Sequence, residues 1–117
     1  DPRQEIMAAH TKYGRIVRDA AALITVLLDR AAIYNVRKDH QGAGACIQNM
    51  LLAIHALGLG GVWLGEIINN EAALLPALGL DPTDYEMMAV IALGRPAQKG
   101  SSDRKPLNTL MLEQIEP

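Results

Sequence analysis

The fold is decided by residues 39–65, which read DHQGAGACIQNMLLAIHALGLGGVWLG. Within residues 42–57 the strongly polar side chains are few: Gln48, Asn49 and His55. A helix with so little polar surface is typical of a position buried on nearly every side, rather than of an amphipathic surface helix. The sequence therefore predicts a core helix over residues 42–57.

The polar side chains of this helix follow a pattern. Gln41, Gln48 and His55 recur every seven residues, so they share one narrow stripe of a helix. Buried polar groups need hydrogen-bond partners, so we expect the stripe to meet another segment, another subunit or a ligand. Gly58 suits the left-handed residue that ends a helix, and Leu59 suits the hydrophobic contact that accompanies such an end.

Length and composition indicate one domain. The chain has 117 residues, of which 50% are hydrophobic and 21% charged. That length is sufficient for a single core. The few charges and long apolar segments predict that further polypeptide or a second subunit covers part of the surface. Because the first residue is Asp1 rather than Met, we also expect a processed or partial chain.

Charge and cysteine content exclude several classes of partner. The net charge is −2 and no basic cluster is interleaved with aromatic residues, which argues against nucleic acid and anionic membranes. No apolar stretch reaches the roughly 20 residues of a membrane-spanning helix. Cys46 is the only cysteine, so it is expected as a buried small hydrophobe in a protein of the reducing cytoplasm. A small-molecule ligand is the expected partner.

Local patterns predict the remaining elements. Asp1 and Pro2 are typical of a helix start, here over about residues 2–11. The apolar run at 21–28 predicts a strand covered on both faces, and residues 86–93 predict a second buried strand, so a central sheet follows. Residues 30–38 have no clear period and predict a loop or short turn.

The second half of the chain contains weaker signals. Residues 70–80 predict a short surface helix with Asn70 as its N-cap, although Pro76 removes a hydrogen bond from it. Residues 98–106 are a polar loop, and 107–115 predict a short helix or an extended tail. No internal repeat is present.

The sequence resembles the nitroreductase family of flavin enzymes. The segments that carry the resemblance occur in the family's order: 39–43 (DHQGA), 48–53 (QNMLLA), 55–60 (HALGLG), 63–65 (WLG), 90–96 (VIALGRP) and 104–107 (RKPL). The resemblance covers essentially the whole chain but only the later two-thirds of the family domain. The family's opening Arg-Arg-Ser-x-Arg stretch and its Asn-x-Gln-Pro region, both near the cofactor, are not found in this chain.

The resemblance implies a single α+β domain over residues 1–117, truncated at its N-terminus. The expected architecture is a nitroreductase-like sandwich with an antiparallel or mixed central sheet flanked by helices, assembled as an intertwined homodimer with FMN in the subunit interface. By resemblance, backbone groups of Val62, Trp63, Leu64 and Gly65 line the flavin ring, with an amide of Leu64 or Gly65 near its N5 atom. Glycine is apt where backbone approaches a planar ring closely.

The resemblance also implies a phosphate contact and an activity. Arg104, with Lys105 as a weaker second, would bind the FMN phosphate, because a guanidinium fork matches phosphate oxygens. The implied function is an FMN-dependent NAD(P)H oxidoreductase that reduces nitroaromatics, quinones or related electrophiles by two-step hydride exchange, with no catalytic side chain because the flavin carries the chemistry. The alternative is a truncated scaffold that dimerises or binds a partner without catalysis.

Simpler structural roles compete with these assignments. Gly58 is interpreted as a helix end. Gly65 is interpreted equally well as a turn residue and as a flavin contact. Trp63 is interpreted first as a packing residue. The histidines His10, His40 and His55 lack metal-site spacing, so a structural role is expected and no metal is implied.

Two further residues sit near the start of the long helix. Asp39 is expected to cap that helix or to interact with its dipole. Tyr34 is a weak candidate for a substrate pocket because it lies in the preceding loop.

Overall fold

The structure is a computed structural model that describes residues 1–113, and it has an α+β fold. The strands are β1 (Ala22–Asp29), β2 (Gly60–Leu64) and β3 (Tyr85–Gly94). The α-helices are α1 (Pro2–Ala9), α2 (Gly14–Asp19), α3 (Val36–Ala56) and α4 (Glu71–Ala77). Short 3₁₀ turns occur at η1 (Arg30–Ala32), η2 (Glu66–Asn70) and η3 (Leu107–Thr109). Within the described residues, no helix is both long and apolar enough to cross a bilayer.

The sheet has three strands in the order β1-β3-β2, and both pairings are antiparallel. β3 is the central strand, and Ala89, Val90 and Ile91 on it are fully buried, so the prediction of a buried strand at residues 86–93 is confirmed. The predicted central sheet is therefore confirmed. β1 occurs one residue later than predicted, and the segment Gly60–Leu64 forms a strand that sequence patterns did not indicate.

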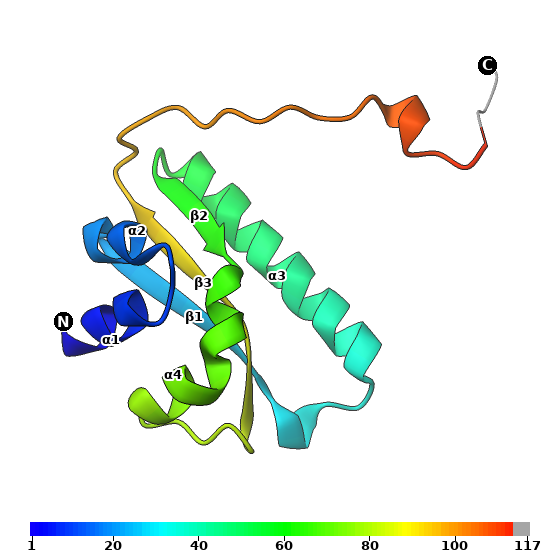
Figure 1. Ribbon diagram of the computed structural model, residues 1–117. Helices are drawn as coiled ribbons and strands as arrows, with labels where there is room; N and C mark the ends of the chain where they lie inside the picture. The colour runs from blue at the N-terminus through cyan, green and yellow to red at the C-terminus, as the bar shows by residue number, and fades with distance from the viewer. Residues whose placement is uncertain (114–117) are drawn as a thin grey trace.

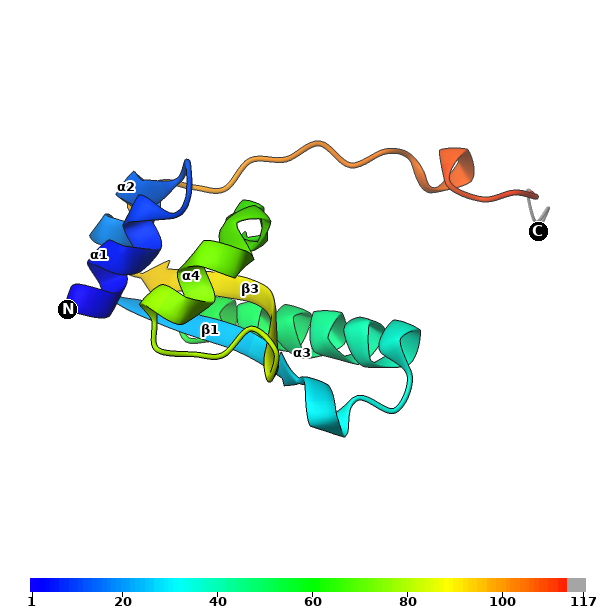
Figure 2. The same ribbon diagram turned by 60° about the horizontal axis from the view of Figure 1, so that its bottom comes forward.

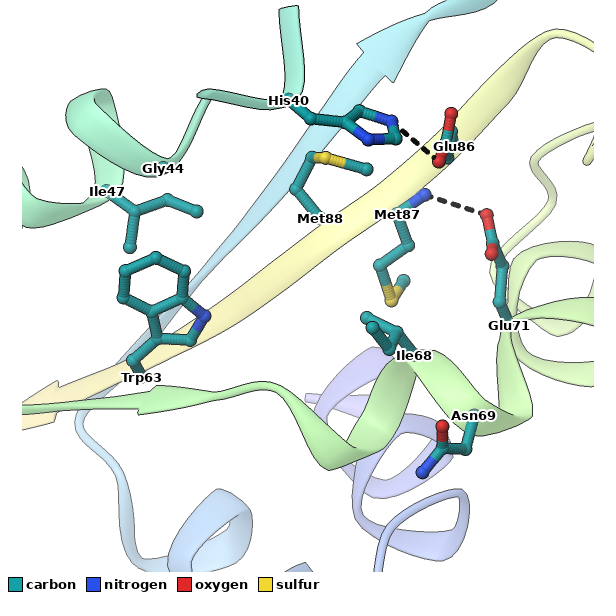
Figure 3. A pocket seen from close by; sticks show the side chains of 10 residues that line it. All are labelled: His40, Gly44, Ile47, Trp63, Ile68, Asn69, Glu71, Glu86, Met87 and Met88. Atoms are coloured by element: carbon teal, nitrogen blue, oxygen red, sulfur yellow. Dashed lines mark hydrogen bonds and ion pairs between the residues drawn. The ribbon is translucent and has the colours of Figure 1, made fainter. Parts of the chain in front are cut away.

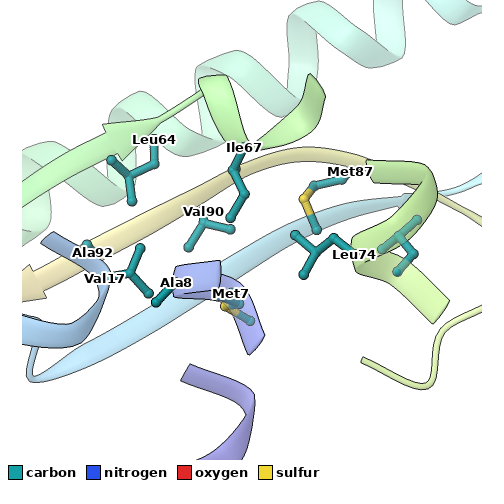
Figure 4. Packing of buried hydrophobic residues seen from close by; sticks show 10 residues of the cluster. Met7, Ala8, Val17, Leu64, Ile67, Leu74, Met87, Val90 and Ala92 are labelled. Carbon is teal, nitrogen blue, oxygen red and sulfur yellow. The ribbon is translucent and has the colours of Figure 1, made fainter. Parts of the chain in front are cut away.

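Helices cover the sheet on two faces (Figures 1 and 2). On one face α3 packs through Ile47 and Ile54 against Ala89 and Ile91 of β3. The other face carries α1, α2 and α4, and its larger cluster is shown in Figure 4. The members of that cluster are Met7, Ala8, Val17, Leu64, Ile67, Leu74, Leu75, Met87, Val90 and Ala92.

The expectation that β1 is covered on both faces is wrong. Most of its residues are half-buried or exposed, and Ile24 is exposed. β1 lies at the edge of the sheet, and the helices of the described residues cover its two faces only in part. Its apolar run therefore resembles a central strand in sequence without being one in the fold.

The expectation for α3 also needs correction. The helix begins at Val36, six residues earlier than predicted, and its N-cap is Asn35, whose side chain accepts from Lys38 N. Asp39 lies in the first turn, where its carboxylate accepts from the amides of Tyr34 and Asn35, so its expected role at the helix start is confirmed.

Only one narrow face of α3 is buried in this chain. Ala43, Ile47 and Ile54 are its buried residues. The stripe of Gln41, Gln48 and His55 is exposed in this chain. Cys46 is also exposed, contrary to its expected burial. The sheet can cover only the side of α3 that faces it, so the apolar outer side has no partner within the described residues.

Glycines end the helices α3 and α4, as predicted. Gly58 has a φ of 73°, its amide bonds to His55 O, and the Leu59 amide bonds to Ile54 O at 3.1 Å. This pair of bonds is the Schellman motif that a left-handed glycine permits. Gly79 ends α4 in the same way, with Leu80 N bonded to Leu75 O.

The other predictions are confirmed only in part. α1 is capped by Asp1 and ends two residues early. α4 contains Pro76 but buries Leu74 and Leu75, so it is a core element rather than a surface helix. The residues after β3 form an extended tail with the short turn η3, and the end of the predicted 107–115 segment lies outside the described residues. α2 had no signal that we recognised.

A matched pair of glycine substitutions tests the packing of this fold. Gly14→Ala would place a Cβ at 2.5 Å from Ala8 O, a backbone atom, so we expect a loss of about 1–3 kcal/mol in the free energy of unfolding. Gly44→Ala would meet only the Trp63 ring at 3.9 Å inside a helix, so a gain of about 0.5–1 kcal/mol is expected. Urea unfolding at one protein concentration measures both, and equal effects would contradict the packing described.

Candidate functional site

The candidate site begins where β2 runs into η2. Leu64, the last residue of β2, is 3% exposed and its side chain packs in the larger core cluster. Side chains alternate along a strand, so Trp63 lies on the opposite face, toward α3. Its side chain is 41% exposed. The Leu64 side chain is therefore not available to a ligand, whereas Trp63 offers its ring and the next residue, Gly65, is half-buried.

The Trp63 ring extends to α3 from the turn at Gly65, the residue that joins β2 to η2. A Cβ built on Gly65 would lie 4.0 Å from its Nε1, and one built on Gly44 would lie 3.9 Å from its Cη2. The two glycines thus mark the opposite ends of the indole. Trp63 has a packing contact with α3, but a large part of its surface stays open.

Gly65 differs from the glycines that precede it. Its φ and ψ are −97° and −29°, which any L-amino acid adopts. By contrast, a Cβ on Gly60 would meet Pro96 at 3.2 Å, and one on Gly61 would meet Ile54 at 3.1 Å. Neither backbone conformation nor internal packing requires glycine at position 65. Open space lies next to its backbone.

Long-range hydrogen bonds hold the turn in place. The carboxylate of Glu66 accepts from Thr11 Oγ1 at 2.6 Å and from Lys12 N at 3.2 Å. Asn70 donates to His10 O at 2.7 Å, so both ends of η2 are tied to the loop after α1. Ile67 between them is fully buried. These partners are more than fifty residues apart in sequence, so no local pattern indicated them.

A pocket of about 490 Å³ opens beside Trp63, between α3, β3 and η2 (Figure 3). It is lined by His40, Gly44, Ile47, Trp63, Ile68, Asn69, Glu71, Glu86, Met87 and Met88. A β-bulge helps to form it: Val26 pairs with Ala89 and Leu27 with Met87, so Met88 is an extra residue in β3. Bulges redirect side chains, and this one turns Met87 and Ala89 to opposite cores.

Charged groups gather at one end of the pocket. His40 Nε2 lies 2.9 Å from Glu86 Oε1, and Arg30 Nη1 lies 3.5 Å from Glu86 Oε2. Glu71 Oε1 accepts the Met87 amide at 2.7 Å. Arg30 does not line the pocket, and its Nε donates to Pro82 O and Tyr85 O. Acidic side chains therefore dominate this end.

Comparison with known proteins identifies the family. The model of the nitroreductase family matches residues 1–95. The chain belongs to the nitroreductase family. The resemblance inferred from the sequence motifs is confirmed, and so is the α+β fold that it implied.

Individual relatives of this nitroreductase-family chain agree. A structure from Desulfovibrio desulfuricans, described as a candidate nitroreductase in complex with FMN, is 63% identical, with a TM-score of 0.98 over 100% of this chain and 68% of its own. Nitroreductase A from Vibrio parahaemolyticus shares the fold, with a TM-score of 0.83 at 23% identity over 100% of this chain and 56% of its own.

One curated relative is an Archaeoglobus fulgidus protein named as a candidate NADH dehydrogenase/NAD(P)H nitroreductase. It is 34% identical over 87 residues, which cover 72% of this chain and 49% of that protein. The chain therefore spans about half the length of the curated relatives it matches.

The family's expected phosphate residues lie apart from the turn. Arg104 and Lys105 are exposed in the extended tail, and Arg104 Nη1 donates to Ser102 Oγ at 2.5 Å. Figures 1 and 2 show this tail leaving the body after β3 and running outward. A single chain thus brings Val62, Trp63, Leu64 and Gly65 together but does not bring the two basic residues to them.

The other residues considered from sequence are placed as follows. Tyr34 is 75% exposed and is not among the residues that line this pocket. His40 does line it, a role that its isolated position in the sequence did not indicate. Among the described residues, no group of three His, Cys, Asp or Glu side chains is placed to hold a metal ion.

A second hollow of about 320 Å³ is lined by Asp1, Gln4, Glu5 and Arg18. An ion pair of 2.6 Å between Arg18 and Glu5 lies in it, and the hydrogen bond from Arg18 lowers the pKa of Glu5. Gln4 donates to three carbonyls of the α2 region, those of Val17, Arg18 and Ala20. The Arg18–Glu5 pair and the amide of Gln4 thus already have partners within the chain, so we do not consider this hollow a ligand site.

Removing the Glu66 carboxylate should loosen the turn. Glu66→Ala leaves the Lys12 amide and the Thr11 hydroxyl without their partner, so we expect a loss of about 1–3 kcal/mol in the free energy of unfolding. Hydrogen exchange should rise at residues 65–70 more than in β3. Asp84→Ala, at an exposed loop position, serves as the control. Unchanged exchange at η2 would contradict this anchoring.

Proposed function

We propose that the chain is part of an FMN-dependent NAD(P)H oxidoreductase that reduces nitroaromatics, quinones or related electrophiles. Membership of the nitroreductase family supports this proposal. The D. desulfuricans structure that is 63% identical holds FMN, which supports the choice of cofactor. When bound, the flavin supplies the redox chemistry by accepting a hydride and passing it to the acceptor in a second step.

Gly65 carries the proposal. The chain's own conformation and packing do not require a glycine there, yet a side chain would project into open space next to the turn. A ligand that approaches the backbone closely explains why no side chain is present. The flat ring of a flavin is such a ligand, as the family resemblance implies.

The backbone of β2 can supply the ring's hydrogen bonds. β2 pairs with β3 on one side only, so among the described residues its other edge has no strand partner. Amide groups at the end of such an edge are fixed donors. We infer that an amide of Leu64 or Gly65 binds the ring near N5, while Val62 and Trp63 contact its surface. Glu66 and Asn70 keep those donors in position through their bonds to the loop after α1.

We further propose that the active form is an intertwined homodimer. The outer face of α3 exposes Val36, Leu52 and Leu57, and the tail exposes Leu107 and Leu110. Exposed apolar side chains on a long helix and an outstretched tail are typical of surfaces that a second copy covers. The tail of one subunit would then carry Arg104 and Lys105 to the phosphate of a flavin held at the other subunit's turn. Cys46, free and unpaired among the described residues, is compatible with the cytoplasm that we propose as the location.

The alternative proposal is a scaffold without turnover. It is favoured by the length of the chain, which covers about half of the curated relatives. A purified protein that is colourless, and whose mass equals that of the 117 residues, would support the scaffold. A yellow protein that oxidises NAD(P)H with a quinone would support the enzyme.

A side chain at Gly65 should displace the cofactor without unfolding the protein. Gly65→Val adds atoms where only Trp63 Nε1 lies within 4.0 Å, so the thermal midpoint should change little. FMN affinity should fall at least tenfold, because the ring can no longer reach the backbone amides. Visible absorbance during FMN titration measures this, and Ala73→Val on the exposed side of α4 is the control. Full FMN affinity in Gly65→Val would contradict the proposed contact.

The phosphate contact predicts a ranked series in the tail. Arg104→Ala should weaken FMN binding by about 10- to 100-fold, as expected for loss of a charge-assisted pair. Lys105→Ala should have a smaller effect, and Lys99→Ala should have none. Riboflavin lacks the phosphate, so its affinity should be the same in all the variants. A loss of riboflavin binding in Arg104→Ala would contradict a phosphate contact.

A further inference from the structure

The pocket beside Trp63 has chemistry that the flavin proposal does not use. Of the four turn residues assigned to the flavin, only Trp63 lines it. Its walls combine one aromatic ring, two methionines and two glutamates. This combination is informative because the residues come from α3, β2, η2, α4 and β3, so the fold rather than a local motif brings them together (Figure 3).

The two glutamates differ in what they can still bind. Both oxygens of Glu86 have partners, His40 on one and Arg30 on the other. For Glu71, the Met87 amide and the more distant Arg30 both approach Oε1, at 2.7 and 3.9 Å. No described residue donates to its Oε2. The Glu71 side chain is 25% exposed, so this oxygen is an available acceptor at the pocket wall.

The charges of the pocket favour a cation. Glu71 and Glu86 line it, and Arg30, which pairs with both, does not. His40 is the only basic side chain among the lining residues, and it is already bonded to Glu86. An anionic ligand would therefore face two carboxylates. A cationic one would meet the free oxygen of Glu71 and, beside it, the face of an indole that attracts positive charge.

We propose that this pocket binds a planar aromatic ligand that carries a cationic nitrogen group, of which an arylamidinium is the simplest example. The aromatic part lies against Trp63 and Met88, and the nitrogen group donates to Glu71 Oε2. The volume of about 490 Å³ accommodates a ligand of one or two rings. Binding requires neither flavin nor turnover, so the proposal is independent of the oxidoreductase assignment.

Trp63 makes the test direct because it is the only tryptophan of the chain. The 117-residue chain is titrated with benzamidine, and its tryptophan fluorescence is recorded; benzoate is the matched anionic probe. We expect a saturable change with benzamidine and at least tenfold weaker binding of benzoate. Equal responses to the two probes would overturn the proposal.

Variants locate the binding. Glu71→Gln keeps an acceptor for the Met87 amide but removes the charge, so benzamidine affinity should fall about tenfold. Gly44→Leu fills the pocket from α3 and should abolish the response even if Glu71→Gln proves unstable. Glu5→Gln, in the ion pair with Arg18, is the control and should bind normally.

The outcomes separate this inference from the proposed function. Wild-type affinity in both pocket variants would overturn the inference, whatever the colour of the protein. A colourless protein that binds benzamidine through Glu71 would support it and count against the flavin assignment. A yellow protein with no response to benzamidine would overturn the inference and support the flavin assignment.

Discussion

The whole structure depends on burying one strand, β3, between two layers of helices. Its residues are almost entirely apolar, and consecutive side chains point to opposite faces. Val90 and Ala92 therefore reach the core with α1, α2 and α4, while Ala89 and Ile91 reach the core with α3. Both cores include side chains of the same ten-residue strand, so the packing of each helical layer depends on β3.

A β-bulge in β3 helps to form the pocket. If β3 alternated without interruption, Met87 and Ala89 would share a face. The bulge at Met88 separates them, so that Met87 joins the core with α4 and Ala89 the core with α3, and Glu86, Met87 and Met88 all line the pocket. β2 ends before it reaches Met87, so the Met87 amide has no backbone acceptor from β2. The carboxylate of Glu71 accepts its hydrogen bond instead. A structural requirement of the sheet thus positions a carboxylate at the candidate site.

The site shows how far sequence reasoning extends. The helix end at Gly58 was predicted correctly because left-handed backbone leaves a clear signature. The glycine-flanked Trp63 segment was expected to face a ligand, but the strand that it forms was not predicted. The pocket was not predicted. His40, Glu71 and Glu86 are ordinary charged residues in sequence, and only the packing of α3 and α4 against β3 brings them together. The failure at β1 and α3 has one cause: apolar composition reports that a segment can be buried, not which neighbour buries it.

The sequence by itself indicated α1, α3, α4, β1 and β3 and the fold class, because helix caps, glycine ends and apolar runs are local properties of the chain. It determined the family as well, through ordered motifs that the comparisons confirm. The tertiary structure decided which strand is central, which side of α3 remains uncovered within the described residues and at which glycines close packing excludes a side chain. Those outcomes depend on contacts between residues far apart in sequence, whose pairing no local pattern specifies.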